Sequence, residues 1–169
     1  MKTQYIIIET KDKKKIDLNI KCIEYSGILK VLLNIDDFDD INECNNLDNQ
    51  DKPIEIPLPE IEYDILEKIK VYLNWKIDNI NNNIEKNTGE QNLFFDNYLS
   101  TMDDDTLFKV ILGANYMEIT ELLDICCKKV ADYIKSCNTP REIRRRFNIK
   151  NDFTPEEEND IKKDHDISY

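Results

Sequence analysis

The order of apolar patterns along the chain restricts its fold more than any other feature of the sequence. Residues 5–9 form a β-branched run and residues 16–20 alternate apolar with polar, which predicts two strands joined by the charged turn 11–15. Residues 53–59 return to an extended pattern, and their prolines confine that strand to a sheet edge. From residue 61 onward the apolar residues recur at helical spacing. A hairpin, a helix, an edge strand and then only helices predict an α+β fold.

Helix starts are marked by residues that satisfy free backbone N–H groups. Ser26 is placed to cap the helix that precedes the edge strand, and Thr120 to cap a later one. Asp103 brings negative charge to the N-terminus of another helix, where it offsets the helix dipole. Trp75, near the end of an amphipathic helix from residue 61, is interpreted as a packed aromatic rather than a wall of a ligand pocket. The helix from Thr120 to about residue 134 is apolar on more than one side, which indicates burial between layers or sharing with a partner.

Two segments, 36–52 and 77–92, differ in composition from the rest of the chain. Both are rich in Asn, and the first also carries clustered Asp residues. Those carboxylates lack the spacing and the closing Glu of a calcium-binding EF-hand loop. We therefore expect both segments to be flexible insertions.

The last thirty residues contain the same helix-start signal twice. Residues 139–142 read Thr-Pro-Arg-Glu and residues 154–157 read Thr-Pro-Glu-Glu, each with an N-cap Thr, Pro at the first helical position and Glu completing a capping box. Between them lie apolar residues that two short helices can hardly bury. Either these residues fold back on the preceding helix, or they form half of a groove that a partner helix completes. The sequence leaves both alternatives open.

Charge and composition exclude several classes of function. A formal net charge of −12 over 169 residues argues against binding to nucleic acid or to an anionic membrane. No apolar run approaches the roughly 18–20 residues of a transmembrane helix. The five cysteines are odd in number and form no C-x-x-C pair, which indicates buried free thiols in a cytoplasmic or nuclear protein.

The residues needed for catalysis or cofactor binding do not occur in usable arrangements. The one histidine, His165, lies near the chain end without a partner to orient it. Three glycines cannot build a phosphate-binding loop, and no spaced cysteines offer a zinc site. The basic residues 144–146 are interpreted as surface ion pairs. We therefore expect no enzymatic activity, no cofactor, no metal and no small-molecule substrate.

Several stretches closely resemble the Skp1 family. They are Thr-Leu-Phe at 106–108, Ile-Leu-Gly-Ala-Asn-Tyr-Met-Glu-Ile at 111–119, Leu-Leu-Asp-Ile-Cys-Cys-Lys at 122–128, and almost all of 139–158. Ile-Pro-Leu-Pro at 56–59 is similar to the short segment that follows the acidic loop of that family. The resemblance is strong from residue 106 to 158 and loose before residue 53. Gly113 departs from it, standing where the family usually has Ala. Such a Gly lowers helix stability by about 0.5–1 kcal/mol unless close packing requires it.

The resemblance implies a BTB/POZ-like α/β domain followed by a C-terminal helical extension. It implies three parts: an N-terminal part over 1–102 with the two insertions, helices over 103–135 that complete the BTB/POZ-like core, and a dimerisation and F-box-binding extension over 136–169. It also implies the adapter of an SCF-type ubiquitin ligase, whose partners are a cullin and F-box proteins.

Site residues follow from the same resemblance. Asn115 and Tyr116 are expected on the cullin-facing side. Pro140 matches a proline that some protist members hydroxylate. The residues expected to line the F-box groove are Leu123, Cys127, Ile134, Ile143, Phe147, Ile149 and Phe153.

Three other functions remain as alternatives. The loose resemblance before residue 53, where part of the cullin-facing side lies in the family, leaves room for an F-box-binding scaffold or decoy that recruits no cullin. An Elongin-C-like adapter would share the BTB-like fold but lack this tail. An enzyme would require titratable groups with shifted pKa values converging in a pocket.

Overall fold

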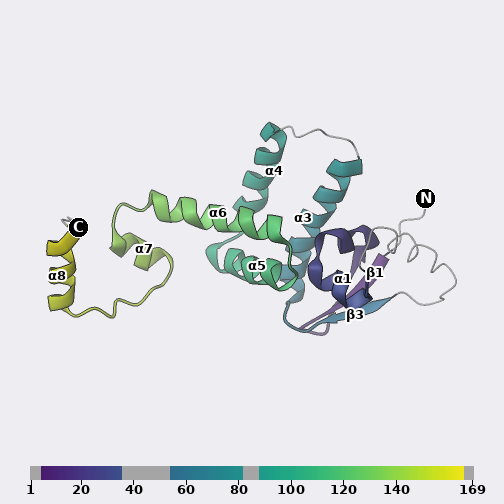
Figure 1. Cartoon of the computed structure of the whole chain (residues 1–169), viewed down its shortest axis with the longest axis horizontal. Coiled ribbons are helices and arrows are strands. Elements are labelled where there is room, and N and C mark those ends of the chain that lie inside the picture. Colours follow the sequence, from purple (N-terminus) through teal and green to yellow (C-terminus); the bar gives the residue numbers. More distant parts are fainter. Residues whose placement is uncertain (1–4, 36–53, 82–87, 166–169) are drawn as a thin grey trace. The chain divides into compact units, whose positions relative to one another are not determined.

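The computed structural model describes residues 5–35, 54–81 and 88–165 (Figure 1). The chain forms two compact units, 1–127 and 128–169. The division falls inside one helix, α6 (Thr120–Ser136), upstream of the boundary between 135 and 136 that the sequence suggested. The predicted insertion at 36–52 lies outside the described residues. No helix within the described ranges is both long enough and apolar enough to cross a membrane.

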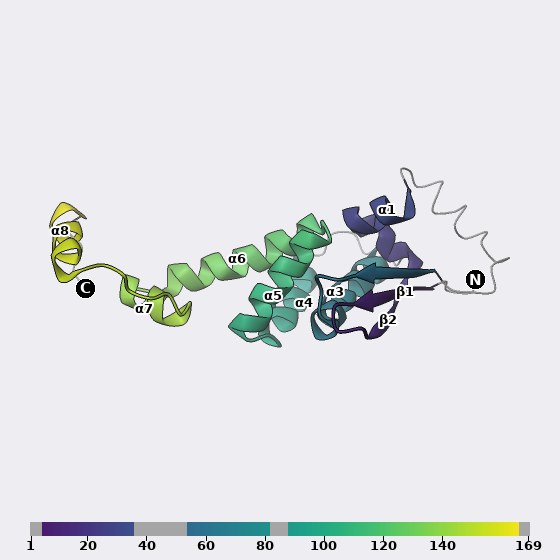
Figure 2. The same ribbon diagram turned by 90° about the horizontal axis from the view of Figure 1, so that it is seen from below.

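A three-stranded sheet opens the first unit (Figure 2). Strands β1 (Tyr5–Thr10) and β2 (Lys15–Asn19) pair antiparallel, and β3 (Glu55–Leu58) pairs parallel to β1, which gives the order β2-β1-β3. Alternate side chains of all three strands are buried, and α3 packs against β2. The predicted hairpin and the predicted edge strand are both confirmed.

The hairpin turn also fixes where α3 (Tyr63–Asn81) begins. Asp12 Oδ1 accepts a hydrogen bond from the Thr10 hydroxyl at 2.7 Å and one from the Tyr63 backbone N–H at 2.9 Å. The hydrogen bond from Thr10, with further contributions from Lys14 and the Tyr63 N–H, holds the pKa of Asp12 well below its usual range. A carboxylate in the turn thus satisfies the first N–H of a helix fifty-one residues later in the chain.

Ser26 joins two segments that are distant in sequence. It follows the short 3-10 helix η1 (Ile20–Tyr25) and caps α1 (Gly27–Leu33), as predicted, by accepting a hydrogen bond from the Leu29 N–H. Its own hydroxyl donates to the Met117 carbonyl at 2.7 Å, just after α5 (Asp104–Tyr116). The start of α1 is therefore anchored to the end of α5, and the donor and acceptor of one buried hydroxyl are both satisfied.

The other two predicted helix starts have different outcomes. Asp103 Oδ1 accepts a hydrogen bond from the Thr106 N–H at 2.8 Å, so Asp103 is the N-cap of α5. Helix α6 includes Thr120 as its first residue, and the Leu123 N–H bonds to the Ile119 carbonyl. Thr120 is thus inside the helix rather than before it, a shift of one residue.

The interpretation of 77–92 as a single insertion is wrong at both ends. Helix α3 continues to Asn81, and α4 (Thr88–Ser100) begins within the predicted range. Aromatic packing explains the extra helix: Trp75 of α3 stacks on Phe94 of α4 with ring centroids 4.4 Å apart and planes 7° apart. Phe95 meets the same Trp75 ring edge-on at 4.9 Å. Trp75 is therefore a packed aromatic, as predicted, and only 82–87 of this range lie outside the described residues.

Gly113 permits close packing of α5 on α3. A Cβ placed there would lie 2.9 Å from Ile69 Cδ1 and 3.3 Å from Ile65 Cγ2, both on α3. Both isoleucines are buried. The glycine that departs from the family pattern therefore occupies a helix crossing where an added methyl group would require the Ile69 side chain to shift.

The second unit contains the end of α6, α7 (Pro140–Arg146) and α8 (Pro155–His165). None of its side chains that the structure describes is buried. The side chain of His165 lies outside the described residues. Over its described residues, this unit consists of helices with defined starts but no apolar core of its own.

Candidate functional site: two interaction surfaces

Helix α7 begins at the first predicted cap. The Glu142 N–H donates to Thr139 Oγ1 at 3.2 Å, and Pro140 takes the first helical position. The Glu142 carboxylate accepts from the Asn138 N–H at 2.8 Å, whereas the capping-box prediction gave it the N–H of Thr139. The cap is confirmed, and its reciprocal bond is shifted by one residue.

Helix α8 begins at the second cap, and here the capping box is complete. The Thr154 N–H donates to Glu157 Oε2 at 2.8 Å, and the Glu157 N–H donates to Thr154 Oγ1 at 3.3 Å. The bond from the Thr154 N–H holds the pKa of Glu157 below its usual value. Both caps thus fix helix starts in a unit that has little packing to hold them.

Apolar side chains of the second unit remain open to solvent. Ile134 is 43% exposed, Ile149 is 53% exposed and Phe153 is 49% exposed, while Ile143 and Phe147 are half-buried. All five were predicted to line a groove for a partner. Large apolar groups exposed within a small unit are typical of a surface that a partner covers.

Two further predicted groove residues lie on the part of α6 that belongs to the first unit. Leu123 is half-buried and Cys127 is exposed, while Leu122 and Cys126 on the same helix are buried. The expectation of buried thiols therefore holds for Cys22 and Cys126, and it is wrong for Cys127. Burial raises the pKa of Cys126 to about 12.

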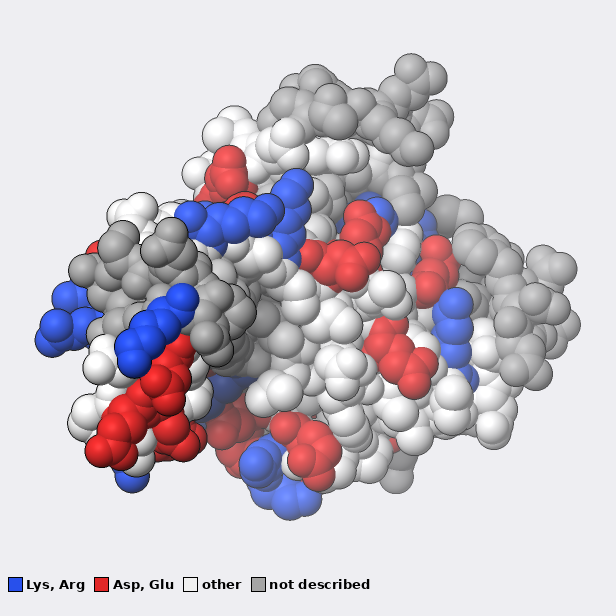
Figure 3. All heavy atoms as spheres, turned by 60° about the vertical axis from the view of Figure 1, so that its left-hand side comes forward, with Lys and Arg blue, Asp and Glu red and all other residues white. Residues whose placement is uncertain are grey.

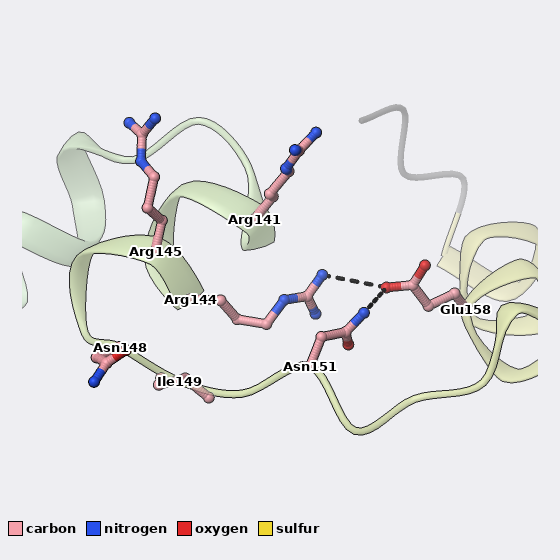
Figure 4. A pocket seen from close by; sticks show the side chains of 7 residues that line it. All are labelled: Arg141, Arg144, Arg145, Asn148, Ile149, Asn151 and Glu158. Carbon is pink, nitrogen blue, oxygen red and sulfur yellow. Dashed lines mark hydrogen bonds and ion pairs between the residues drawn. The ribbon is translucent and has the colours of Figure 1, made fainter.

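A polar hollow of about 680 Å³ lies beside α7 (Figure 4). Arg144 Nη2 lies 3.3 Å from Glu158 Oε1 of α8, and Asn151 Nδ2 donates to the same oxygen at 2.9 Å. The guanidinium of Arg146 lies 3.9 Å from the ring centre of Tyr133. The predicted surface ion pair is therefore confirmed for Arg144, whereas Arg146 makes a cation–π contact. The lining residues are Arg141, Arg144, Arg145, Asn148, Ile149, Asn151 and Glu158.

The residues predicted to face a cullin lie at the end of α5 in the first unit. Asn115 is exposed, and Tyr116 is half-buried at the wall of a hollow of about 430 Å³. Leu112, one turn earlier, lines the same hollow and is 68% exposed. Lys109 Nζ and Glu62 Oε2, 3.0 Å apart, form an ion pair at its edge. Sequence reasoning missed Leu112, although a leucine four residues before Tyr116 was a signal that it shares that face.

On the face of the molecule drawn in Figure 3, charge is mixed: acidic and basic side chains form groups separated by uncharged surface. Over the described ranges, no three His, Cys, Asp or Glu side chains come together in a way that could hold a metal ion.

Comparison with known proteins identifies the family. Residues 120–166 match the model of the Skp1 family, dimerisation domain. The SCF ubiquitin ligase complex protein SKP1a of Dictyostelium discoideum is 40% identical over 129 residues, covering 74% of this chain and 78% of that protein. The E3 ubiquitin ligase complex SCF subunit sconC of Talaromyces stipitatus is 32% identical over 170 residues, covering 95% of this chain and 94% of that protein. This chain belongs to the Skp1 family.

The family assignment confirms the resemblance, and the helices with their small three-stranded sheet confirm the predicted α+β fold. A third relative, SKP1-like protein 1A of Arabidopsis thaliana, is 40% identical over 119 residues, covering 68% of this chain and 74% of that protein. The matched family model spans α6, α7 and α8, and so includes both caps, the exposed apolar side chains and the polar hollow of this Skp1-family chain. The roles of the individual groove residues, of Asn115 and Tyr116 and of Pro140 stay predictions.

Proposed function

We propose that this protein is the adapter subunit of an SCF-type E3 ubiquitin ligase, bridging a cullin to F-box substrate receptors. It takes part in protein ubiquitination without being an enzyme itself. The observation that carries the proposal is the second unit, whose helix starts are fixed by caps while Ile149 and Phe153 remain exposed. Membership of a family whose relatives are named as SCF ubiquitin ligase subunits supports it.

The F-box surface in this proposal is made by the apolar residues of α6, α7 and the segment between α7 and α8. Capped helices present these side chains before a partner arrives, which reduces the ordering cost of binding. A partner helix with apolar anchors at helical spacing would cover them. The residues assigned to this surface are Leu123, Cys127, Ile134, Ile143, Phe147, Ile149 and Phe153.

Capture of F-box proteins tests this surface. In the free chain Ile149 and Phe153 are exposed, so Ile149→Asp with Phe153→Asp leaves folding intact. Burying an apolar side chain contributes about 2 kcal/mol, and losing two should weaken binding by more than about 100-fold. The measurement is co-purification with F-box proteins followed by titration of one of them. Lys135→Asp with Lys150→Asp, at two exposed sites in the same unit, is the control. Equal capture by the apolar double variant and the wild type would remove the groove assignment.

The cullin surface in this proposal is the end of α5. Asn115→Lys with Tyr116→Lys is expected to abolish cullin binding and to spare F-box capture. Leu112→Asp changes an exposed side chain in the same hollow and should weaken cullin binding without affecting the helix end. Loss of both partners together would indicate misfolding. F-box capture by a wild-type chain that never recruits a cullin would identify a scaffold or decoy instead.

We place this function in the cytoplasm and the nucleus. Cys22, Cys126, Cys127 and Cys137 are free cysteines, which suits a reducing compartment. Imaging of a fluorescently tagged full-length chain in its host tests the placement, and a signal confined to a secretory compartment would contradict it.

A further inference from the structure

Arginine is concentrated in one helix of this chain. All four arginines, at 141, 144, 145 and 146, lie in α7, and every other basic side chain apart from His165 is a lysine. Arginine presents a planar fork of donors that matches a carboxylate, whereas lysine acts as a compact, strongly hydrated charge. Three of the four arginines line the hollow beside α7. In an acidic chain, this hollow therefore concentrates positive charge.

The hollow already recognises a carboxylate. Glu158 Oε1 accepts one hydrogen bond from the Arg144 guanidinium at 3.3 Å and one from the Asn151 side-chain amide at 2.9 Å (Figure 4). The side chain of Arg144 is 21% exposed and that of Glu158 is 27% exposed, so the pair is more enclosed than an ordinary surface ion pair. A charged donor and a neutral donor converging on one oxygen form a recognition element for a carboxylate group.

The other two arginines of the hollow, Arg141 and Arg145, differ from Arg144 in their side-chain contacts. Within the part of the chain that the structure describes, neither Arg141 nor Arg145 forms a hydrogen bond or an ion pair through its side chain. In Figure 4 their guanidinium groups lie away from Glu158, while that of Arg144 points at its carboxylate. The exposed Ile149 supplies an apolar wall of the same hollow. The hollow thus offers two unused guanidinium groups beside one that is occupied.

We propose that this hollow binds the carboxylate side chains of an acidic segment in the protein that docks on the second unit. In the free chain Glu158 occupies the place of one of those carboxylates. The inference rests on the proposed function, because it takes the docking protein to be the F-box partner. It adds a charge preference to a surface otherwise defined by apolar contacts.

The surroundings favour a short acidic segment over a nucleic acid. A formal net charge of −12 repels long polyanions, whose binding depends on many phosphate contacts. The hollow also adjoins negative charge, because Glu158 lies in the first turn of α8 together with Glu156 and Glu157. The anionic group that the hollow holds in the free chain is the carboxylate of Glu158. A segment with a few Asp or Glu side chains matches this arrangement, because exchange with Glu158 preserves the same pair of donors.

Peptide titration against the full-length chain tests the inference without any F-box protein. The probes are a labelled peptide of alternating Ala and Glu, the same peptide with Gln in place of Glu, and the same peptide with phosphoserine in place of Glu. Two new ion pairs of surface strength should make the Glu peptide bind roughly tenfold more tightly than the Gln peptide at low salt. The preference should decrease as salt is added.

Matched variants locate the effect. Arg141→Gln with Arg145→Gln should abolish the preference for the Glu peptide. Lys135→Gln with Lys150→Gln removes the same charge from exposed sites outside the hollow and should retain the preference.

A second pair of variants tests the role of Glu158. Glu158→Gln frees Arg144 and should strengthen binding of the Glu peptide several-fold more than Glu156→Gln. The latter removes the same charge from the same helical turn without changing the contact with Arg144.

Four outcomes would overturn the inference. They are equal binding of the Glu and Gln peptides, equal effects of the arginine and lysine double variants, equal effects of the two Glu variants, and binding of the phosphoserine peptide alone. These experiments distinguish a wrong charge preference from a wrong adapter function. Lost peptide preference with intact F-box capture overturns only the charge preference, whereas intact peptide preference with no F-box capture overturns only the proposed partner.

Discussion

At the scale of single residues, Gly113 shows how a departure from a family pattern acquires a structural reason. Helix propensity alone says that Ala in its place would stabilise α5 by about 1 kcal/mol. The position of Ile69 Cδ1, 2.9 Å from the missing Cβ, opposes this gain, because a methyl group at residue 113 requires the Ile69 side chain to move. Cδ1 is the flexible end of that side chain, so the crowding cost lies at the low end of the about 1–3 kcal/mol found in packed cores.

We therefore expect Gly113→Ala to change the free energy of unfolding by less than about 1 kcal/mol, because a crowding cost near 1 offsets a propensity gain near 1. Ile69→Val removes the Cδ1 atom that an alanine at residue 113 would displace. In the Ile69→Val background, Gly113→Ala should therefore be more stabilising than in the wild type, by up to about 1 kcal/mol. Urea unfolding of the four proteins of this double-mutant cycle measures the coupling. Additive effects of the two substitutions would show that the crossing has room for a methyl group.

Asp12 gives a prediction that depends on pH. Its carboxylate accepts from the Tyr63 N–H in the folded chain, and its folded pKa is lowered relative to about 3.9 in an unfolded chain. A lowered folded pKa means that the carboxylate stabilises the fold above the unfolded pKa and that this contribution is lost as pH falls through the folded pKa. Asp12→Asn should therefore lower Tm at neutral pH and have a diminishing effect below about pH 4.

Thermal unfolding of the wild type and Asp12→Asn across that range is the measurement. Asp132→Asn, at an exposed site on α6, serves as the control and should change Tm little at any pH. A Tm difference for Asp12→Asn that stayed constant into acid would show that the turn depends on side-chain shape rather than charge.

The sequence was informative about residues with local functions and uninformative about those with distant partners. Ser26 was predictable as a cap and Asp103 as negative charge at a helix start, because both act on the few residues that follow them. The bond from the Ser26 hydroxyl to Met117 spans 91 residues and the bond from the Tyr63 N–H to Asp12 spans 51, and no local pattern encodes either. Glu158 escaped prediction for the same reason: Arg144 lies fourteen residues away on another helix.

At the scale of elements, aromatic packing extends two helices into a segment of poor helical composition. Asn-rich sequence between residues 77 and 92 gave no sign of α4, because Asn has low helix propensity and no apolar face is visible there. Phe94 on Trp75 and Phe95 against the same ring supply contacts that propensity scales do not include. Tertiary packing prevails over local preference in this pair of helices.

Phe94→Leu should weaken the α3–α4 pairing by about 0.5–1.5 kcal/mol, the contribution of an aromatic pair beyond its buried area. Trp75 is the single tryptophan, so its fluorescence reports the change directly. We expect red-shifted emission and a lower denaturation midpoint in Phe94→Leu. Leu93→Ala, at an exposed neighbouring position, is the control. Unchanged emission would show that the stacked rings contribute little to the environment of Trp75.

At the scale of the whole molecule, the two units differ in how their stability arises. The first has a core built by the sheet and by α3, α5 and the start of α6. Not one described side chain of the second is buried. The sequence showed an excess of apolar residues in the tail, but their exposure depends on what the chain places around them. The boundary within α6 was likewise not predictable, since the helical pattern continues through it.

Hydrogen exchange should reflect this difference between the units. Amides of α7 and α8 should exchange faster than those of α3 and α5, which should exchange only by global unfolding. Addition of an F-box partner should slow exchange in α7 and α8 by more than about tenfold, because the partner covers side chains that are exposed in the free chain. Mass spectrometry of peptides from both units measures this. Slow exchange throughout α7 and α8 in the free chain would contradict a unit that lacks its own core.

The missing core of the second unit also affects how the protein can evolve. Substitutions at buried positions must preserve packing, so most of them are removed because they destabilise the fold. Substitutions at exposed positions of such a unit change the free energy of unfolding by only about 0.5 kcal/mol or less. Selection on α7 and the segment after it would therefore act through the proposed partner surface rather than through folding stability. The resemblance to the family is nevertheless strong from residue 106 to 158 and loose before residue 53, as expected where a shared partner surface holds exposed residues constant.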